Sequence, residues 1–232
     1  INLRCDTISE REEQFLKVFI MYDLIIKNGL IYDGKGGRPF KADIAILEEK
    51  IVSVGSIKGE SKKTIDASGR IVTPGFVDIH THYDGQVTWD PYLRPSTYHG
   101  VTTVVMGNCG VGFSPCKPDQ RDWLIGLMEG VEDIPGTALH EGIDWEWESF
   151  PEYLDALEKK PLAIDVGTQI PHGAVRAYVM GERGINHEEA TEEEIKKMKQ
   201  IVKEAIEAGA YGFSTSRTEK HNDVNGNLTP SI

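Results

Sequence analysis

From residue 71 onward, the sequence alternates between short apolar runs and longer amphipathic ones. Apolar runs of strand length occur at residues 71–79, 101–107, 163–170 and 209–215, the first interrupted by Pro74-Gly75. Stretches with the apolar spacing of helices lie between them, at 121–131, 150–159 and 191–208. A strand followed by a helix and another strand is typical of parallel βαβ units. The pattern therefore predicts an α/β fold with a parallel sheet.

About four such units are half of the eight in a (β/α)₈ barrel, which typically needs about 250 residues. We therefore expect residues 74–232 to form the first half of a TIM barrel, left incomplete, with an open α/β sheet as the structural alternative. Residues 21–73 contain short, evenly spaced strand patterns, which favour part of a small β-sandwich. In this segment Asn28-Gly29 is a strong hairpin signal.

Residues 1–20 have no clear period and no visible link to the rest of the chain. Two interpretations stay open for them: an upstream or non-native extension before a start at Met21, or a short helix over residues 10–20. They also lack the uninterrupted apolar core of a signal peptide.

The charge balance excludes some classes of partner. Lys and Arg total 25 and Asp and Glu total 37, so the net charge is −12. This argues against nucleic acid and anionic membrane surfaces as partners. The three cysteines are irregularly spaced and odd in number, which implies no disulfide framework and favours a reducing, cytoplasmic location.

The segment from Asp78 to Asp84, DIHTHYD, is the sharpest candidate site. Side chains alternate along a strand, so Asp78, His80 and His82 share one face, with Asp84 a further candidate for it. The carboxyl ends of parallel strands are where α/β active sites form. Two neutral imidazoles at this position can bind one Zn²⁺, whereas the plainer interpretation is a polar loop that contains two histidines.

A second candidate follows the next strand, in the glycine-rich segment GNCGVG at residues 107–112. Cys109 could approach the histidine pair in space, and its thiolate is a good zinc ligand. Two alternatives remain: a buried free cysteine, or a dinucleotide-binding loop, although the glycine spacing differs from that fingerprint.

The remaining candidates are less specific. His172 follows the third strand pattern, where we favour a role in a polar contact. Arg217 follows the fourth strand pattern and could hold a substrate carboxylate or be an ordinary loop arginine. His221 lies in a polar, turn-rich stretch and is expected to be exposed. Residues 121–147 form a long connection between strands, and long connections on a rigid scaffold often carry binding function.

Taken together, these motifs resemble the N-acyl-D-amino-acid deacylase branch of the amidohydrolase superfamily. The similar segments cover residues 22 to about 230 and include PGFVDIHTHYD (74–84), HGVTTVVMGNCGVGFSP (99–115), RDWLIGLMEGVEDIPGTAL (121–139) and GFSTSR (212–217). The first of these indicates only the superfamily, and GNCGVG narrows it to this branch.

The resemblance implies a β-sandwich domain and a metal-dependent (β/α)₈ barrel. It implies His80, His82 and Cys109 as ligands of one or two Zn²⁺ ions, and Arg217 and His172 remain the substrate-binding candidates. The implied reaction is hydrolysis of the amide of a small N-acyl-D-amino acid by zinc-activated water, with an aspartate passing the proton to the leaving amine.

In the family, that aspartate and two further histidine ligands lie on later barrel strands, beyond residue 232, so we expect this chain alone to be inactive. Alternatives are a hydantoinase-like cyclic-amide hydrolase, a dipeptidase, or a non-catalytic truncated product.

Overall fold

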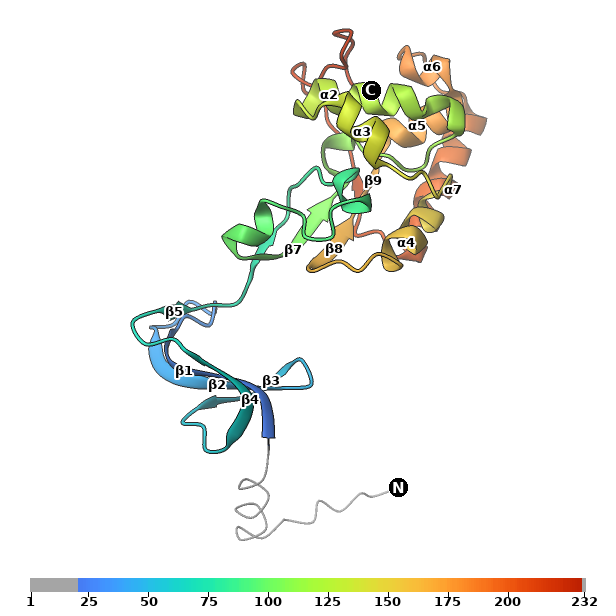
Figure 1. The fold of residues 1–232 in the computed structure, drawn as a ribbon. Helices are drawn as coiled ribbons and strands as arrows, with labels where there is room; N and C mark the ends of the chain where they lie inside the picture. The colour runs from blue at the N-terminus through green and yellow to red at the C-terminus, as the bar shows by residue number, and fades with distance from the viewer. Residues whose placement is uncertain (1–20, 231–232) are drawn as a thin grey trace, which may run out of the picture. The chain divides into compact units, whose positions relative to one another are not determined.

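The computed structural model describes residues 21–230 (Figure 1). The expectations for residues 1–20 lie outside the described residues. The chain divides into two compact units, with the boundary between Pro74 and Gly75, and each unit is described by itself. In the described part of the chain, no helix is both long and apolar enough to cross a membrane.

The N-terminal unit is built on one mixed β-sheet. Its strands are β1 (Met21–Ile31), β2 (Phe40–Leu47), β3 (Lys50–Gly55), β4 (Glu60–Asp66) and β5 (Ile71–Val72). The order is β3-β2-β1-β4, and β5 also pairs with β1. The β1–β2 and β2–β3 pairs are antiparallel, whereas β4 and β5 run parallel to β1. Residues 21–74 thus supply one sheet layer, not the two packed layers of a sandwich.

The hairpin predicted at Asn28-Gly29 is wrong, because β1 continues through both residues. Asn28 has a left-handed backbone (φ 61°), and the pairing of β1 with β2 shifts register between Ile26 and Gly29. The Asn28 N–H donates to Asp43 Oδ1 at 2.9 Å. A residue that tolerates positive φ suits a bulge as well as a turn, and here the long-range pairing with β2 selects the bulge.

The C-terminal unit contains parallel strands that follow one another in sequence order. They are β6 (Phe76–Asp78), β7 (Val101–Met106), β8 (Asp165–Thr168), β9 (Ile170–Pro171) and β10 (Phe213–Ser214). The pairs β6–β7, β7–β8 and β9–β10 are all parallel. Because only Gln169 separates β8 from β9, each apolar run of the sequence lies beside the next. The predicted parallel α/β arrangement is confirmed.

The helices of this unit are α2 (Arg121–Glu132), α3 (Gly136–Gly142), α4 (Phe150–Glu158), α5 (His172–Met180), α6 (Glu182–Ile185) and α7 (Glu192–Ala208). Short 3₁₀ turns are η1 (Gln86–Thr88), η2 (Ser96–His99), η3 (Asn108–Gly110) and η4 (Pro118–Gln120). Helices α2, α4 and α7 confirm the predicted ones, whereas α3, α5 and α6 were missed. Helix α7 contacts both α4 and α5, and α2 packs on α3 (Figure 1).

The core of the C-terminal unit lies between the sheet and the helices. Val104 and Met106 of β7 are completely buried in one cluster with Leu124 and Leu127 of α2 and with Tyr153 of α4. The alternate residues of β7 are only partly covered, as expected of a strand with one face against the core. This packing fixes the position of the loops that follow β6 and β7.

Candidate metal centre

The histidine pair lies in the segment that follows β6. The strand ends at Asp78, earlier than predicted, so His80 and His82 are in an extended loop and not in the strand. Thr81 keeps this loop beside β7, because its N–H and its Oγ1 both donate to the Val105 carbonyl, at 3.0 and 2.8 Å. The alternation persists, and the two imidazole rings lie 5.4 Å apart.

Cys109 lies in the turn that follows β7. Gly107 and Cys109 both have left-handed backbones, with φ of 70° and 56°. A Cβ on Gly107 would collide with the Gln169 carbonyl oxygen, so only glycine fits there. The chain can therefore turn sharply at the end of β7 and direct Cys109 toward the loop after β6.

Two side chains from other elements hold this turn on both sides of Cys109. Asp84 Oδ1 accepts the Gly107 N–H at 2.8 Å. The Ser214 hydroxyl of β10 accepts the Gly110 N–H at 3.0 Å and donates to the Gly107 carbonyl. All these atoms are buried, where a satisfied hydrogen bond strongly favours one geometry.

The structure brings His80, His82 and Cys109 together. Their candidate ligand atoms all lie within 4.8 Å of one another, and His80 Nε2 is 3.2 Å from Cys109 Sγ. The pocket beside them has a volume of about 370 Å³. His82 Nδ1 is buried without a hydrogen-bond partner. Two imidazoles and a thiol, with one ring nitrogen left unsatisfied, are a donor set that fits Zn²⁺.

Burial controls the protonation of these groups. It lowers the pKa of His82 to about 4, with smaller effects from His80 and His221, so His82 is neutral at pH 7. Burial also raises the pKa of Cys109, assisted by Glu132 and Asp84. A neutral imidazole is ready to bind a metal ion, whereas the thiol must lose its proton to do so.

Asp84 is buried and lies outside the three-residue cluster. Burial raises the pKa of its carboxyl group to about 7, against the hydrogen bond from Gly107. Its second oxygen, Oδ2, is buried without a hydrogen-bond partner. Its contact with the turn before Cys109 makes Asp84 a structural support of this turn.

Two residues near the site were missed by the sequence analysis. Glu132, the last residue of α2, places Oε1 3.2 Å from His82 Nε2. His221 was expected to be exposed but is half-buried. Its Nδ1 is hydrogen-bonded to Ser216 Oγ at 3.1 Å, and His221 contributes to the lowered pKa of His82. The long connection over residues 121–147 was the only sequence signal for Glu132.

His172 and Arg217 lie at the ends of β9 and β10, outside the cluster. His172 begins α5, its Nδ1 is 3.0 Å from Thr215 Oγ1, and its ring packs 5.2 Å from the ring of Phe213. Burial lowers the pKa of His172 to about 4, with help from Arg176 and Arg217. Arg217 is exposed. Their role in substrate binding stays a prediction.

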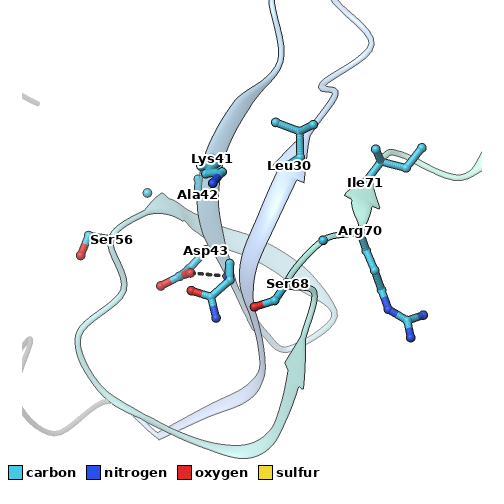
Figure 2. A pocket seen from close by; sticks show the side chains of 11 residues that line it. Leu30, Lys41, Ala42, Asp43, Ser56, Ser68, Arg70 and Ile71 are labelled. Carbon is cyan, nitrogen blue, oxygen red and sulfur yellow. Dashed lines mark hydrogen bonds between the residues drawn. The ribbon is translucent and has the colours of Figure 1, made fainter.

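A second pocket, of about 810 Å³, lies in the N-terminal unit, along β1 and β2 (Figure 2). Asn28 and Asp43, which are joined by a hydrogen bond, both line it, as do Lys41, Ser56 and Arg70. Its lining contains no histidine and no cysteine. It is therefore a hollow of mixed polar and apolar lining on the sheet, without the imidazole and thiolate donors of the His80, His82 and Cys109 cluster.

Comparison with known proteins identifies the family of this chain. The sequence profile of the Amidohydrolase family matches residues 63–229, which include the whole His/His/Cys cluster. The chain belongs to the amidohydrolase family. This confirms the resemblance seen in the sequence motifs.

Relatives of this chain within the amidohydrolase family include deacylases. The chain is 34% identical over 195 residues to the D-aminoacylase of Alcaligenes xylosoxydans xylosoxydans, covering 84% of this chain and 37% of the relative. It is similar to the structure of N-acyl-D-glutamate deacylase from Bordetella bronchiseptica complexed with zinc and a phosphonate inhibitor. That match has a TM-score of 0.71 and 32% identity, and covers 84% of this chain and 38% of the other.

A solved structure of a D-aminoacylase with a binuclear metal centre is also similar to this chain. That match has a TM-score of 0.69 and 32% identity, and covers 84% of this chain and 38% of the other. The chain thus spans less than two fifths of the length of these relatives.

Proposed function

We propose that this chain is part of a zinc-dependent enzyme that hydrolyses the amide of N-acyl-D-amino acids to a carboxylate and a D-amino acid. The observation that carries the proposal is the cluster of His80, His82 and Cys109, whose ligand atoms lie within 4.8 Å. The zinc-bound deacylase from Bordetella bronchiseptica supports both the metal and the reaction class.

The fold is consistent with this assignment. Parallel strands that follow one another in sequence order are those of the first part of a (β/α)₈ barrel, whose active sites lie at the carboxyl ends of the strands. His80 and His82 follow β6, and Cys109 follows β7. We infer that residues 74–232 belong to such a barrel, and residues 21–73 to the β-sandwich domain that accompanies it.

His80, His82 and Cys109 would hold one or two zinc ions. When bound, zinc polarises an amide carbonyl and lowers the pKa of water to near neutrality. The protein prepares for it by keeping His82 neutral through burial. The buried bonds of Asp84 and Ser214 hold the turn that carries Cys109.

We assign substrate contacts to His172 and Arg217. The Arg217 guanidinium is exposed, positively charged and able to bind the substrate carboxylate through two parallel hydrogen bonds. His172 is held by Thr215 and kept neutral, so it can exchange a hydrogen bond with the acyl amide. These roles extend the site from the metal cluster toward the ends of β9 and β10.

The test is a substrate panel assayed with the purified protein that contains this chain. N-acetyl-D-amino acids should be hydrolysed, whereas N-acetyl-L-amino acids, hydantoins and dipeptides should not. Chelation of the metal and the variant His80→Ala should each abolish turnover. His140→Ala is the matched control, because His140 lies on the exposed surface of α3 and should leave activity unchanged.

Preferential hydrolysis of hydantoins or dipeptides would contradict the proposed substrate class. Tight zinc binding without turnover of any amide would instead support a non-catalytic role.

A further inference from the structure

The carboxylate of Glu132 reaches the candidate metal centre from an element that no motif assigns to it. Glu132 ends α2, more than twenty residues after Cys109, and its Oε1 is 3.2 Å from His82 Nε2. Its side chain is 24% exposed, and that of His82 is 11% exposed. Glu132 lines the same pocket as His80 and His82.

The charges around this pocket are one-sided. Asp78 and Glu132 both line it, and the charge of Glu132 raises the pKa of the nearby Asp84 and Cys109. Among the described residues that line the pocket, none is lysine or arginine. Glu132 is also at a helix C-terminus, where the helix dipole disfavours an anion, and Asp133 follows it. A half-buried anion in this setting is stabilised by a cation placed beside it.

Glu132 lies outside the group of His80, His82 and Cys109 whose ligand atoms are all within 4.8 Å of one another, so its contact with His82 is the one that bears on coordination. Two ligand atoms held at about 2.1 Å from one tetrahedral zinc ion lie about 3.4 Å apart, and a nitrogen and a sulfur ligand lie about 3.6 Å apart. Glu132 Oε1 and His82 Nε2 are 3.2 Å apart, and so are His80 Nε2 and Cys109 Sγ. Both pairs are thus close to the spacing of neighbouring ligands around a metal ion, for coordination of His82 through Nε2, the nitrogen that faces Glu132.

We propose that Glu132 is a further metal ligand, which supplies a carboxylate oxygen at the His82 side of the cluster of His80, His82 and Cys109. The inference rests on the proposed function, because it requires a divalent metal ion at that cluster. It assigns a role to the end of α2: this helix delivers a ligand, in addition to its contribution to the core.

The experiment titrates metal-free protein with Co²⁺, whose visible absorption reports the number and type of ligands. The variant Glu132→Gln keeps the size of the side chain and an oxygen that can still accept a hydrogen bond from His82. It therefore separates metal binding from orientation of the imidazole. Asp133→Asn is the matched control, because it removes the same charge one residue later at an exposed position.

Glu132→Gln should weaken the affinity for Co²⁺ by about tenfold or more and alter the visible spectrum. Asp133→Asn should bind Co²⁺ as the unaltered protein does. Should Glu132→Gln lose its native far-UV circular dichroism, Glu132→Asp provides the second comparison, since it keeps the carboxylate and should shift the spectrum without abolishing binding.

A Co²⁺ spectrum that is unchanged in Glu132→Gln would overturn the inference, whether or not the affinity falls, and would leave Glu132 as a partner that only orients His82. Cys109→Ser distinguishes this failure from that of the proposed function. If Cys109→Ser loses the sulfur-to-cobalt absorption while Glu132→Gln is unchanged, the three-residue site stands without Glu132. An unaltered protein that takes up no Co²⁺ would overturn both.

Discussion

Burial sets the protonation state of the individual groups around Cys109. His82 and Asp84 are two residues apart, yet burial lowers the pKa of the imidazole to about 4 and raises that of the carboxyl group to about 7. Desolvation disfavours the charged form of each group, which gives opposite directions for a base and an acid. Both groups are therefore driven toward neutrality in the metal-free protein.

Asp84 leads to a pH dependence of stability. Its pKa is about 7 in the folded protein and near its usual value of 3.8 in the unfolded chain. Between these values the folded state keeps a proton that the unfolded state loses, so the free energy of unfolding falls as the pH rises. A shift of about three units corresponds to about 4 kcal/mol.

Asp84→Asn should remove this contribution while keeping an oxygen for the Gly107 N–H. Urea denaturation of the metal-free protein with a chelator present, at pH 5 and at pH 8, is the measurement. The decrease in the free energy of unfolding from pH 5 to pH 8 should be smaller in Asp84→Asn than in the unaltered protein. Equal pH dependence in the two proteins would show that Asp84 does not titrate in this range.

At the scale of elements, the turn after β7 depends on strands that are distant in sequence. The Ser214 hydroxyl of β10 accepts a hydrogen bond from the Gly110 N–H and donates one to the Gly107 carbonyl. Both partners lie more than one hundred residues earlier in the sequence. Asp84 bonds the Gly107 N–H from the other side. The position of Cys109 is thus determined jointly by the segments after β6 and β7 and by β10.

Ser214→Ala should therefore loosen this turn. It leaves a buried N–H and a buried carbonyl without their partner, at a cost of about 1–3 kcal/mol in the free energy of unfolding. The zinc affinity should fall as well, because Cys109 is held less firmly. Urea denaturation and competition with a chromophoric chelator measure the two effects.

Ser114→Ala is the matched control. The Ser114 hydroxyl is also buried but has no hydrogen-bond partner, so its removal should leave both quantities nearly unchanged or raise the stability slightly. A loss of stability in Ser214→Ala without any change in zinc affinity would show that the hydroxyl does not position Cys109.

For the whole molecule, the two units differ in the size of their cores. The buried cluster of the N-terminal unit consists of Tyr22, Ile25 and Ala45, whereas that of the C-terminal unit includes residues from β7 and from most of the helices. Apolar burial is the main stabilising term in folding, so the N-terminal unit should be the less stable one.

We therefore expect two unfolding transitions in urea. All four tryptophans, Trp89, Trp123, Trp145 and Trp147, lie in the C-terminal unit, so tryptophan fluorescence follows that unit alone. Far-UV circular dichroism follows both units and should begin to change at a lower urea concentration. Coincident transitions by the two probes would indicate that the units unfold as one.

Local patterns predicted much of this protein correctly, because they act over a few residues. Helix α7 begins as its capping box indicates, with Thr191 Oγ1 accepting the Glu194 N–H and Glu194 accepting the Thr191 N–H. The alternation of His80, Thr81 and His82 places both imidazoles on one side. The hairpin at Asn28-Gly29 failed because β2, distant in sequence, pairs with β1 through a bulge.

The sequence by itself determined the alternation of strands and helices, the capped start of α7 and the identities of His80, His82 and Cys109 as candidate ligands. The tertiary structure decided which groups meet: Cys109 beside His80, Glu132 beside His82, and Ser214 bonded to the turn that carries Cys109. The physical reason is that periodicity and capping act within a few residues. The site is assembled by the packing of strands and helices that are tens to more than one hundred residues apart.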